Sequence, residues 1–152
     1  MGGAWSRAGL VLATVLVADQ VTKALVRDGV ELGSESSVIP LVKLVHTRNS
    51  GVAFGAFEDQ IVVVVVLIAL AVGALLAYFA THRDRPWAWL PTGLLAGGAL
   101  GNVVDRAREG FVTDFVKLPY WPAFNVADMA ITLGVLSLLL VAERSDGASK
   151  RA

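Results

Sequence analysis

Four long stretches of apolar residues divide the chain, and shorter polar segments separate them. They cover about residues 8–26, 61–80, 87–104 and 125–142. A helix that crosses a hydrocarbon core of about 30 Å needs roughly 20 predominantly apolar residues, and each stretch is long enough. The second begins with the valine run IVVVVVLIALAVG and carries no charge, so it is the clearest span. This pattern predicts a membrane protein of the all-α class with four transmembrane helices.

The segment between the first two stretches, residues 27–60, is the longest polar connection. Its part SSVIPLVKLVHTRNSGVAFG has β-branched residues followed by a turn at Asn49 to Gly51. Such a pattern favours short strands over a helix. We therefore expect a small sheet on the membrane surface at the mouth of the helix bundle. The whole chain reads as one membrane-embedded domain, with a disordered tail at residues 145–152.

The first apolar stretch also has features of a cleaved signal peptide, because Arg7 precedes it and Ala18 could sit at a cleavage site. Leu16 is a poor residue for the position three before such a site, and the helical pattern continues past Asp19. We therefore favour a membrane span. Positively charged residues are nearly balanced between the two sides of a four-span arrangement, so charge alone leaves the orientation open.

The composition is too apolar for a soluble domain of 152 residues, with 55% hydrophobic residues, a mean hydropathy of +0.64 and a net charge of zero. There is no cysteine, which excludes disulfides, thiolate nucleophiles and cysteine-bound metals. Positive and negative residues are interleaved, so the sequence offers no basic surface for nucleic acid. His46 and His82 lie in connecting segments without ligand spacing, and no function is assigned to them.

Polar residues within or beside the apolar stretches occur in pairs at helical spacing. The pairs are Asp19 with Lys23, Asn102 with Asp105, and Asn125 with Asp128. A charged side chain at the centre of a bilayer costs about 2.5–3.5 kcal/mol, so it needs a partner or a function. Because successive spans alternate in direction, we expect these pairs, together with Asn49 and Asp114, to converge near one membrane surface.

Structural roles account for part of this set. Asp19 and Lys23 can form an ion pair that fixes helix orientation, and Asp105 with Arg106 can anchor a helix end. Asp128 has no basic residue at helical spacing, and Asp114 has only Lys117, three residues later. Two carboxyl groups that share a site hold one proton between them, and such a pair can activate water and polarise a carbonyl group, as in an aspartyl protease. Histidine-based zinc sites and the G-x-S-x-G motif are absent from the sequence.

Four blocks in order, ADQVTKALV, RNSGVAFG, GGALGNVVDRAREGFVTDF and PAFNVADMAITLG, resemble the lipoprotein signal peptidases, or signal peptidase II. The resemblance implies four membrane helices, an extracytoplasmic β-structure between helices 1 and 2, and both termini in the bacterial cytoplasm. It implies an aspartic endopeptidase of the cytoplasmic membrane that works near the extracytoplasmic surface. The implied reaction removes the signal peptide from diacylglyceryl-modified prolipoproteins, before the lipidated cysteine. No cofactor is implied, globomycin is the implied inhibitor, and we expect a monomer surrounded by membrane lipids.

By this resemblance Asp114 and Asp128 form the catalytic pair. The residues expected to shape the site or bind substrate are Asp19, Lys23, Asn49, Gly51, Asn102, Asp105, Arg106 and Asn125. The spacing of Asn102 and Asp105 duplicates that of Asn125 and Asp128, so Asp105 remains the second choice as partner of Asp128. Val52 departs from the commoner alanine of the family's N-[ST]-G-A-A-F block.

Two other classes of function stay open on the residues alone. A transporter could use membrane aspartates to relay protons, although four spans are too few for the usual inverted repeats. A scaffold could dimerise through the face formed by Gly93, Gly97 and Gly101, although tight packing between helices of one chain is the simpler interpretation. The scaffold leaves the convergent polar residues without a purpose.

Overall fold

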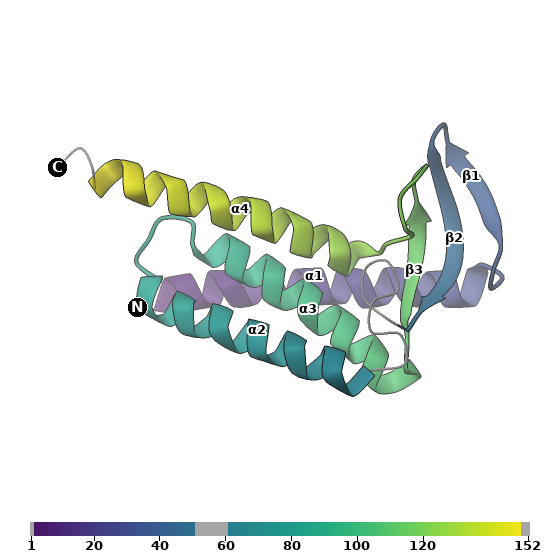
Figure 1. Cartoon of the computed structure of the whole chain (residues 1–152), viewed down its shortest axis with the longest axis horizontal. Coiled ribbons are helices and arrows are strands. Elements are labelled where there is room, and N and C mark those ends of the chain that lie inside the picture. Colours follow the sequence, from purple (N-terminus) through teal and green to yellow (C-terminus); the bar gives the residue numbers. More distant parts are fainter. Residues whose placement is uncertain (1, 51–60, 150–152) are drawn as a thin grey trace.

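The computed structural model describes residues 2–50 and 61–149, and it contains four long helices with a small sheet at one end (Figure 1). The helices are α1 (Gly2–Gly29), α2 (Ile61–His82), α3 (Trp89–Glu109) and α4 (Val126–Ser149). Each predicted span overlaps one of them. Both ends of the described chain lie at the end of the bundle remote from the sheet (Figure 1). Gly51 and Val52 lie outside the described residues.

Three of the described helices are long and apolar enough to cross a membrane: Gly3–Gly29, Val62–His82 and Val126–Glu143. Large apolar side chains on them point outward, among them Leu10, Val62, Leu70 and Leu133. A soluble bundle would bury such residues, whereas a membrane protein turns them toward lipid. Helix α3 is not among them, and its last turns carry Asp105, Arg106, Arg108 and Glu109. The chain is therefore a multi-pass membrane protein.

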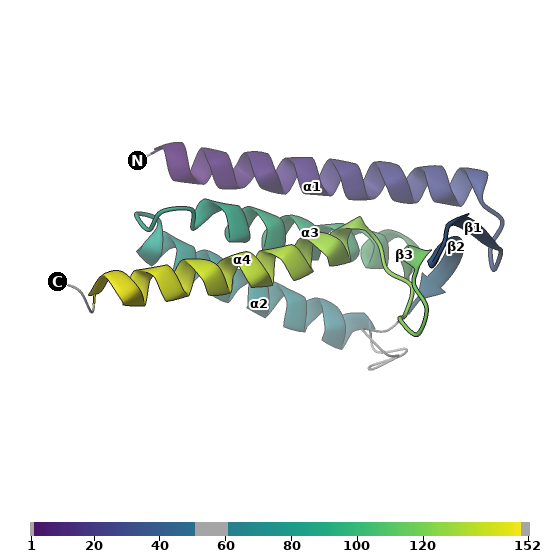
Figure 2. The ribbon, with the colours of Figure 1, turned by 90° about the horizontal axis from the view of Figure 1, so that it is seen from above.

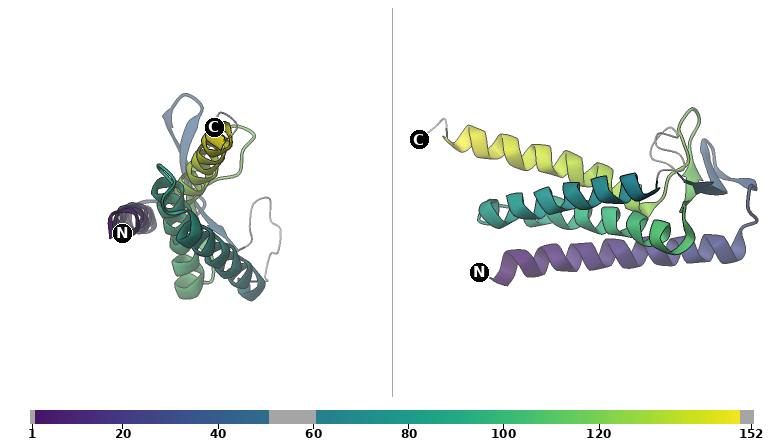
Figure 3. Two further views of the ribbon diagram at one scale, coloured as in Figure 1. Left: turned by 90° about the vertical axis from the view of Figure 1, so that its left-hand side faces the viewer. Right: turned by 60° about the horizontal axis from the view of Figure 1, so that its bottom comes forward.

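Helix α3 is the central element of the bundle and contacts the other three helices (Figures 2 and 3). Glycines make this close approach possible. A Cβ atom on Gly97 would lie 2.9 Å from the carbonyl oxygen of Leu12 in α1, and one on Gly98 would lie 2.5 Å from that of Ala127 in α4. The Gly93 and Gly97 positions both face α1, so this face packs within the chain and is not available for dimerisation.

The sheet is antiparallel, with the strand order β1 (Glu35–Ile39), β2 (Val42–Asn49) and β3 (Val112–Lys117). The predicted strands between the first two helices are present as β1 and β2. The third strand comes from the connection between α3 and α4, for which no strand was predicted. Its residues Val112 to Phe115 are buried, because β3 pairs with β2 and packs against α1 and α3. This strand brings Asp114 to the helix bundle.

Helix α4 continues past residue 142, the predicted end of the fourth span, and through residues 145–149. These five positions belong to the tail, residues 145–152, that was predicted to be disordered. The segment contains no proline, and the helix propagates from the long apolar part that precedes it. Residues 150–152 lie outside the described part of the chain.

Candidate active site

Asp114 sits in the middle of β3, and its side chain is almost fully buried. Thr47 of β2 lies opposite it in the sheet, and Asn49 lies on the same face two residues further along. The Asn49 amide donates a hydrogen bond to Asp114 Oδ2 at 3.0 Å. The register between β2 and β3 therefore places an asparagine beside this carboxyl group.

Asp128 lies in the first turn of α4, where Asn125 caps the helix. The Asn125 Oδ1 atom accepts the backbone N–H of Asp128 at 3.0 Å, and Asp128 Oδ2 accepts the backbone N–H of Asn125 at 3.1 Å. This reciprocal pair is a capping box, which satisfies two N–H groups that helix geometry leaves without partners. The positive end of the helix dipole also favours a negative charge at this position.

Asn125 links the two aspartates to each other. Its side-chain amide donates to Asp114 Oδ1 at 2.7 Å, while its backbone N–H is bound to Asp128. The same amide also reaches Asn102 Oδ1 at 3.2 Å and the backbone oxygen of Thr113 at 3.4 Å. One fully buried residue thus contacts both carboxyl groups from a fixed position.

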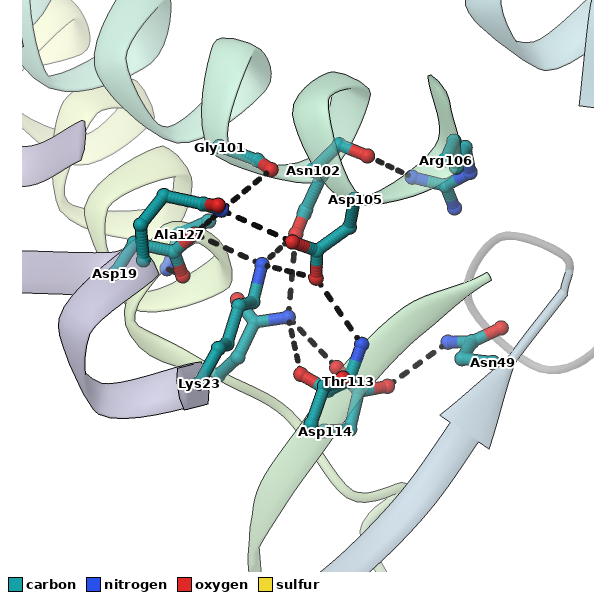
Figure 4. A network of polar contacts seen from close by, with 12 residues as sticks. Asp19, Lys23, Asn49, Gly101, Asn102, Asp105, Arg106, Thr113, Asp114 and Ala127 are labelled. Atoms are coloured by element: carbon teal, nitrogen blue, oxygen red, sulfur yellow. Dashed lines mark hydrogen bonds and ion pairs between the residues drawn. The ribbon is translucent and has the colours of Figure 1, made fainter. Parts of the chain in front are cut away.

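Lys23 is the centre of a buried ionic cluster in the same region (Figure 4). Its Nζ atom lies 2.8 Å from Asp19 Oδ2 and 3.1 Å from Asp105 Oδ2, and it donates to Asn102 Oδ1 at 3.0 Å. Because the oxygen of the Asn102 amide faces Lys23, its nitrogen faces Asp128 and donates to Oδ1 at 2.9 Å. The lysine on α1 therefore fixes the direction of a hydrogen bond to an aspartate on α4.

Asp105 is committed to structural contacts within this cluster. Besides its ion pair with Lys23, its Oδ2 atom accepts the backbone N–H of Thr113 at 3.2 Å, and Oδ1 accepts Gln20 Nε2 at 2.9 Å. The bond to Thr113 positions the residue that precedes Asp114. Asp19 makes a similar contact beside Asp128. Its Oδ1 atom accepts the backbone N–H of Ala127, the residue before Asp128, at 2.9 Å.

Burial is the main cause that raises the pKa of Asp114, to about 6. The negative charge of Asp128 adds to this rise, whereas hydrogen bonds from Asn49 and Asn125 and the charge of Lys23 lower the pKa. Arg106 on α3 interacts electrostatically with Asp128, Asp114 and Asp105. A carboxyl group in this position readily holds a proton at mildly acidic pH.

The described site residues predicted from the sequence do converge. They are Asp19, Lys23, Asn49, Asn102, Asp105, Arg106, Asp114, Asn125 and Asp128, which form a connected set of contacts. Gly51 lies outside the described residues. Three neighbours were missed: Gln20, which joins Asp19, Asp105 and the Gly101 carbonyl, Thr113, and Arg27, which lies 3.8 Å from Asp105 Oδ1. Gln20 could have been found from the sequence, because it is a polar residue within an apolar span.

A protein-family model described as "Signal peptidase (SPase) II" matches residues 11–143. Curated relatives named lipoprotein signal peptidase match most of the chain. The protein of Symbiobacterium thermophilum is 42% identical over 139 residues, which cover 86% of this chain and 91% of the relative. That of Moorella thermoacetica is 40% identical over 131 residues, with coverage of 85% and 87%.

Solved structures with similar folds are described as those of a bacterial membrane enzyme. One has a TM-score of 0.85 at 29% sequence identity and covers 94% of this chain and 90% of its own. A second has a TM-score of 0.80 at 29% identity, with coverage of 89% and 91%. The structural similarity therefore extends over most of the fold.

Proposed function

The chain belongs to the signal peptidase II family, and on that basis we propose that it is an aspartic endopeptidase that removes signal peptides from bacterial prolipoproteins. Asp114 and Asp128 are the catalytic pair in this proposal. The substrate is a prolipoprotein whose cysteine already carries a diacylglyceryl group, and the bond cut lies just before that cysteine.

The observation that carries the proposal is the position of Asn125, which contacts the Asp114 carboxyl group with its side chain and that of Asp128 with its backbone. Charge balance supports a shared proton. Among the described residues, the cluster contains four carboxyl groups, those of Asp19, Asp105, Asp114 and Asp128, and three cations, Lys23, Arg27 and Arg106. One proton on the catalytic pair makes this partly buried set neutral.

Asp128 is the general base in our mechanism, and Asp114 carries the shared proton. Hydrogen bonds from Asn102 and from the Asn125 backbone stabilise the charge on Asp128. Asp128 takes a proton from water as the water oxygen bonds to the scissile carbonyl carbon, and Asp114 gives its proton to the carbonyl oxygen. A neutral tetrahedral diol results.

The second step reverses the roles of the two aspartates. Asp128 gives its proton to the amide nitrogen as the carbon–nitrogen bond breaks, and Asp114 takes a proton from one hydroxyl group of the diol. The products are the carboxyl group of the signal peptide and the free amine of the lipidated cysteine. The pair ends with one proton, as it began, and titrates as a unit.

We propose that α3 is the fourth membrane span. Its polar residues Asn102, Asp105 and Arg106 are buried against the other elements, so they do not meet lipid, and the helix can cross a membrane despite its composition. Both termini then lie in the cytoplasm, and the sheet and the aspartates lie near the extracytoplasmic surface of the cytoplasmic membrane. The substrate enters sideways from the bilayer, with its acyl chains left among lipid tails, and globomycin blocks the same pair of aspartates.

The direct test of this function uses purified wild-type protein in detergent. Incubation with a diacylglyceryl-modified prolipoprotein should yield a product smaller by the mass of the signal peptide, and globomycin should prevent this change. The matched control is the same prolipoprotein without the lipid. Cleavage elsewhere than before the cysteine would refute the proposed specificity, as would equal cleavage of the unmodified substrate.

The transporter alternative predicts a substrate-dependent pH gradient in proteoliposomes, without any change in substrate mass. The scaffold alternative loses its main feature, because Gly93 and Gly97 are occupied by α1. Neither alternative explains why Asn125 contacts two carboxyl groups at once.

A further inference from the structure

An apolar groove of about 600 Å³ lies at one end of the sheet, and neither catalytic aspartate lines it. The turn between β1 and β2 forms one wall, and residues 117–121, which follow β3, form the other. The strands run across the long axis of the helices, and the β1–β2 turn extends sideways past α4 (Figure 1). This part of the sheet therefore overhangs the region beside the bundle.

The groove is bordered by large apolar side chains that face outward. Val38, Ile39 and Leu41 are 62%, 59% and 73% exposed, and Tyr120 and Trp121 on the other wall are also exposed. We call these five residues the rim. Leu41 and Tyr120 have positive φ angles of 71° and 61°, a backbone conformation that costs about 1–2 kcal/mol per non-glycine residue. The fold thus accepts strain on both walls while presenting apolar groups to the surroundings.

The connection of the rim to α4 indicates how deep the rim lies in the membrane. Trp121 lies five residues before Val126, where the candidate span Val126–Glu143 begins. Tryptophan and tyrosine are enriched at membrane–water interfaces, where an apolar ring meets lipid and its polar atom meets water. Met129 and Leu133, on the first turns of that span, are 46% and 53% exposed. The rim is therefore close in sequence to the lipid-facing surface of α4.

The charges beside the groove complement an anionic membrane surface. Lys43 and Lys117 are opposite each other on β2 and β3, and both line the groove. Glu35 pairs with both lysines, which lowers its pKa to about 2 and keeps it ionised at neutral pH. Two lysines and one carboxylate leave one net positive charge beside the apolar rim.

We infer that the rim inserts into the outer interfacial layer of the bilayer and that Lys43 and Lys117 face anionic lipid headgroups. The occupant of the groove is membrane lipid. The contact holds the sheet, and with it Asp114 on β3, at a fixed height above the hydrocarbon core. If the proposed function is right, this is the level at which the lipidated cysteine of the substrate lies.

The absence of cysteine from the chain allows single spin labels to report on this contact. We would introduce Leu41→Cys or Val38→Cys at the rim, and Leu32→Cys as the matched control. Leu32 is also an exposed leucine, but it precedes β1, at the opposite end of that strand from the turn. Each labelled protein would be placed in nanodiscs of phosphatidylethanolamine and phosphatidylglycerol, without substrate, and its collision rates with oxygen and with a polar nickel chelate measured.

We expect rim labels to collide about tenfold less with the nickel chelate than the Leu32 label does, because polar complexes are excluded from apolar layers. Their collisions with oxygen should increase, and the effect should weaken in discs of phosphatidylcholine alone. Equal nickel collision rates at the rim and at Leu32 would overturn the inference. So would rim labels shielded only after prolipoprotein is added, since the groove would then bind substrate. No step requires peptidase activity, so this result is independent of whether the proposed reaction is correct.

Discussion

Asn125 and Asn102 show how neutral side chains can set up a pair of acids. Asn125 donates to Asp114 and caps the helix that carries Asp128, and Asn102 donates to Asp128 while Lys23 holds its oxygen. The asparagine amides are neutral. They therefore orient the two carboxyl groups without changing the charge balance that leaves one proton on the pair. The orientation of each amide is fixed by a second partner.

Asn49 provides a way to shift the pH dependence of cleavage. Its hydrogen bond to Asp114 lowers the pKa of that carboxyl group, against the larger rise caused by burial. Cleavage requires one proton on the pair, so kcat/KM should fall as the pH rises through the pKa of Asp114, about 6. In Asn49→Ala this alkaline limb should move to higher pH. A pH–rate profile measures the shift, and an unchanged or lower limb would show that Asn49 does not act on the pair.

Residue spacing alone could not decide which acid is the partner of Asp128. Asn102 with Asp105 and Asn125 with Asp128 have the same spacing, but only the second pair forms a capping box. Asp105 instead lies near the end of α3, where Lys23, Gln20 and the Thr113 backbone occupy its oxygens. These contacts come from distant parts of the chain, so a local pattern does not contain them.

At the level of elements, apolar length predicted the helices well and the sheet only in part. The strands β1 and β2 lie in the segment where strands were expected. Strand β3 has only six residues, and its pairing partner β2 is more than sixty residues earlier in the chain. Such a short segment becomes a strand through pairing and burial, which depend on tertiary context.

Helix packing gives a prediction about the glycines of α3. A Cβ atom at Gly97 would approach the Leu12 carbonyl oxygen to 2.9 Å, so Gly97→Ala must push α1 away from α3. Lys23 on α1 would then move relative to Asn102, and we expect both the melting temperature and the cleavage rate to fall. Gly73→Ala is the control, because a Cβ atom there has nothing within 4 Å. It should retain both properties, and equal behaviour of the two variants would contradict the packing argument.

The molecule as a whole reverses the usual distribution of polarity. Its outer surface carries leucines and valines, and its interior contains Asp19, Lys23, Asp105 and Asn125. The surface leucines and valines face lipid. The buried polar residues satisfy one another through ion pairs and hydrogen bonds. The sequence predicted this inversion from composition and pairing of polar residues. It could not predict the groove beside the sheet, because one wall of that groove follows β3, for which no strand was predicted.

The buried acid should also make the stability of the whole protein depend on pH. The pKa of Asp114 rises from 3.8 to about 6 on folding, so the native state holds this proton between those values while the unfolded chain releases it. Stability should therefore increase as the pH falls from 8 to 5, by about 1.4 kcal/mol from this group, because the full effect of the shift develops only below the unfolded pKa. Melting temperatures in detergent at the two pH values should show this gain in the wild type and a smaller gain in Asp114→Asn. The same gain in both proteins would place the titrating group elsewhere.

The most direct test of the account is the cleavage of diacylglyceryl-modified prolipoprotein by Asp114→Asn and Asp128→Asn, each shown to be folded by its melting temperature. Product mass and rate would be compared with those of the wild type, with Asp105→Asn as the competing assignment. We predict that both catalytic-pair variants fold and leave the substrate uncut, whereas Asp105→Asn retains measurable cleavage. Full processing by folded Asp114→Asn, together with loss of cleavage in folded Asp105→Asn, would contradict the shared-proton pair.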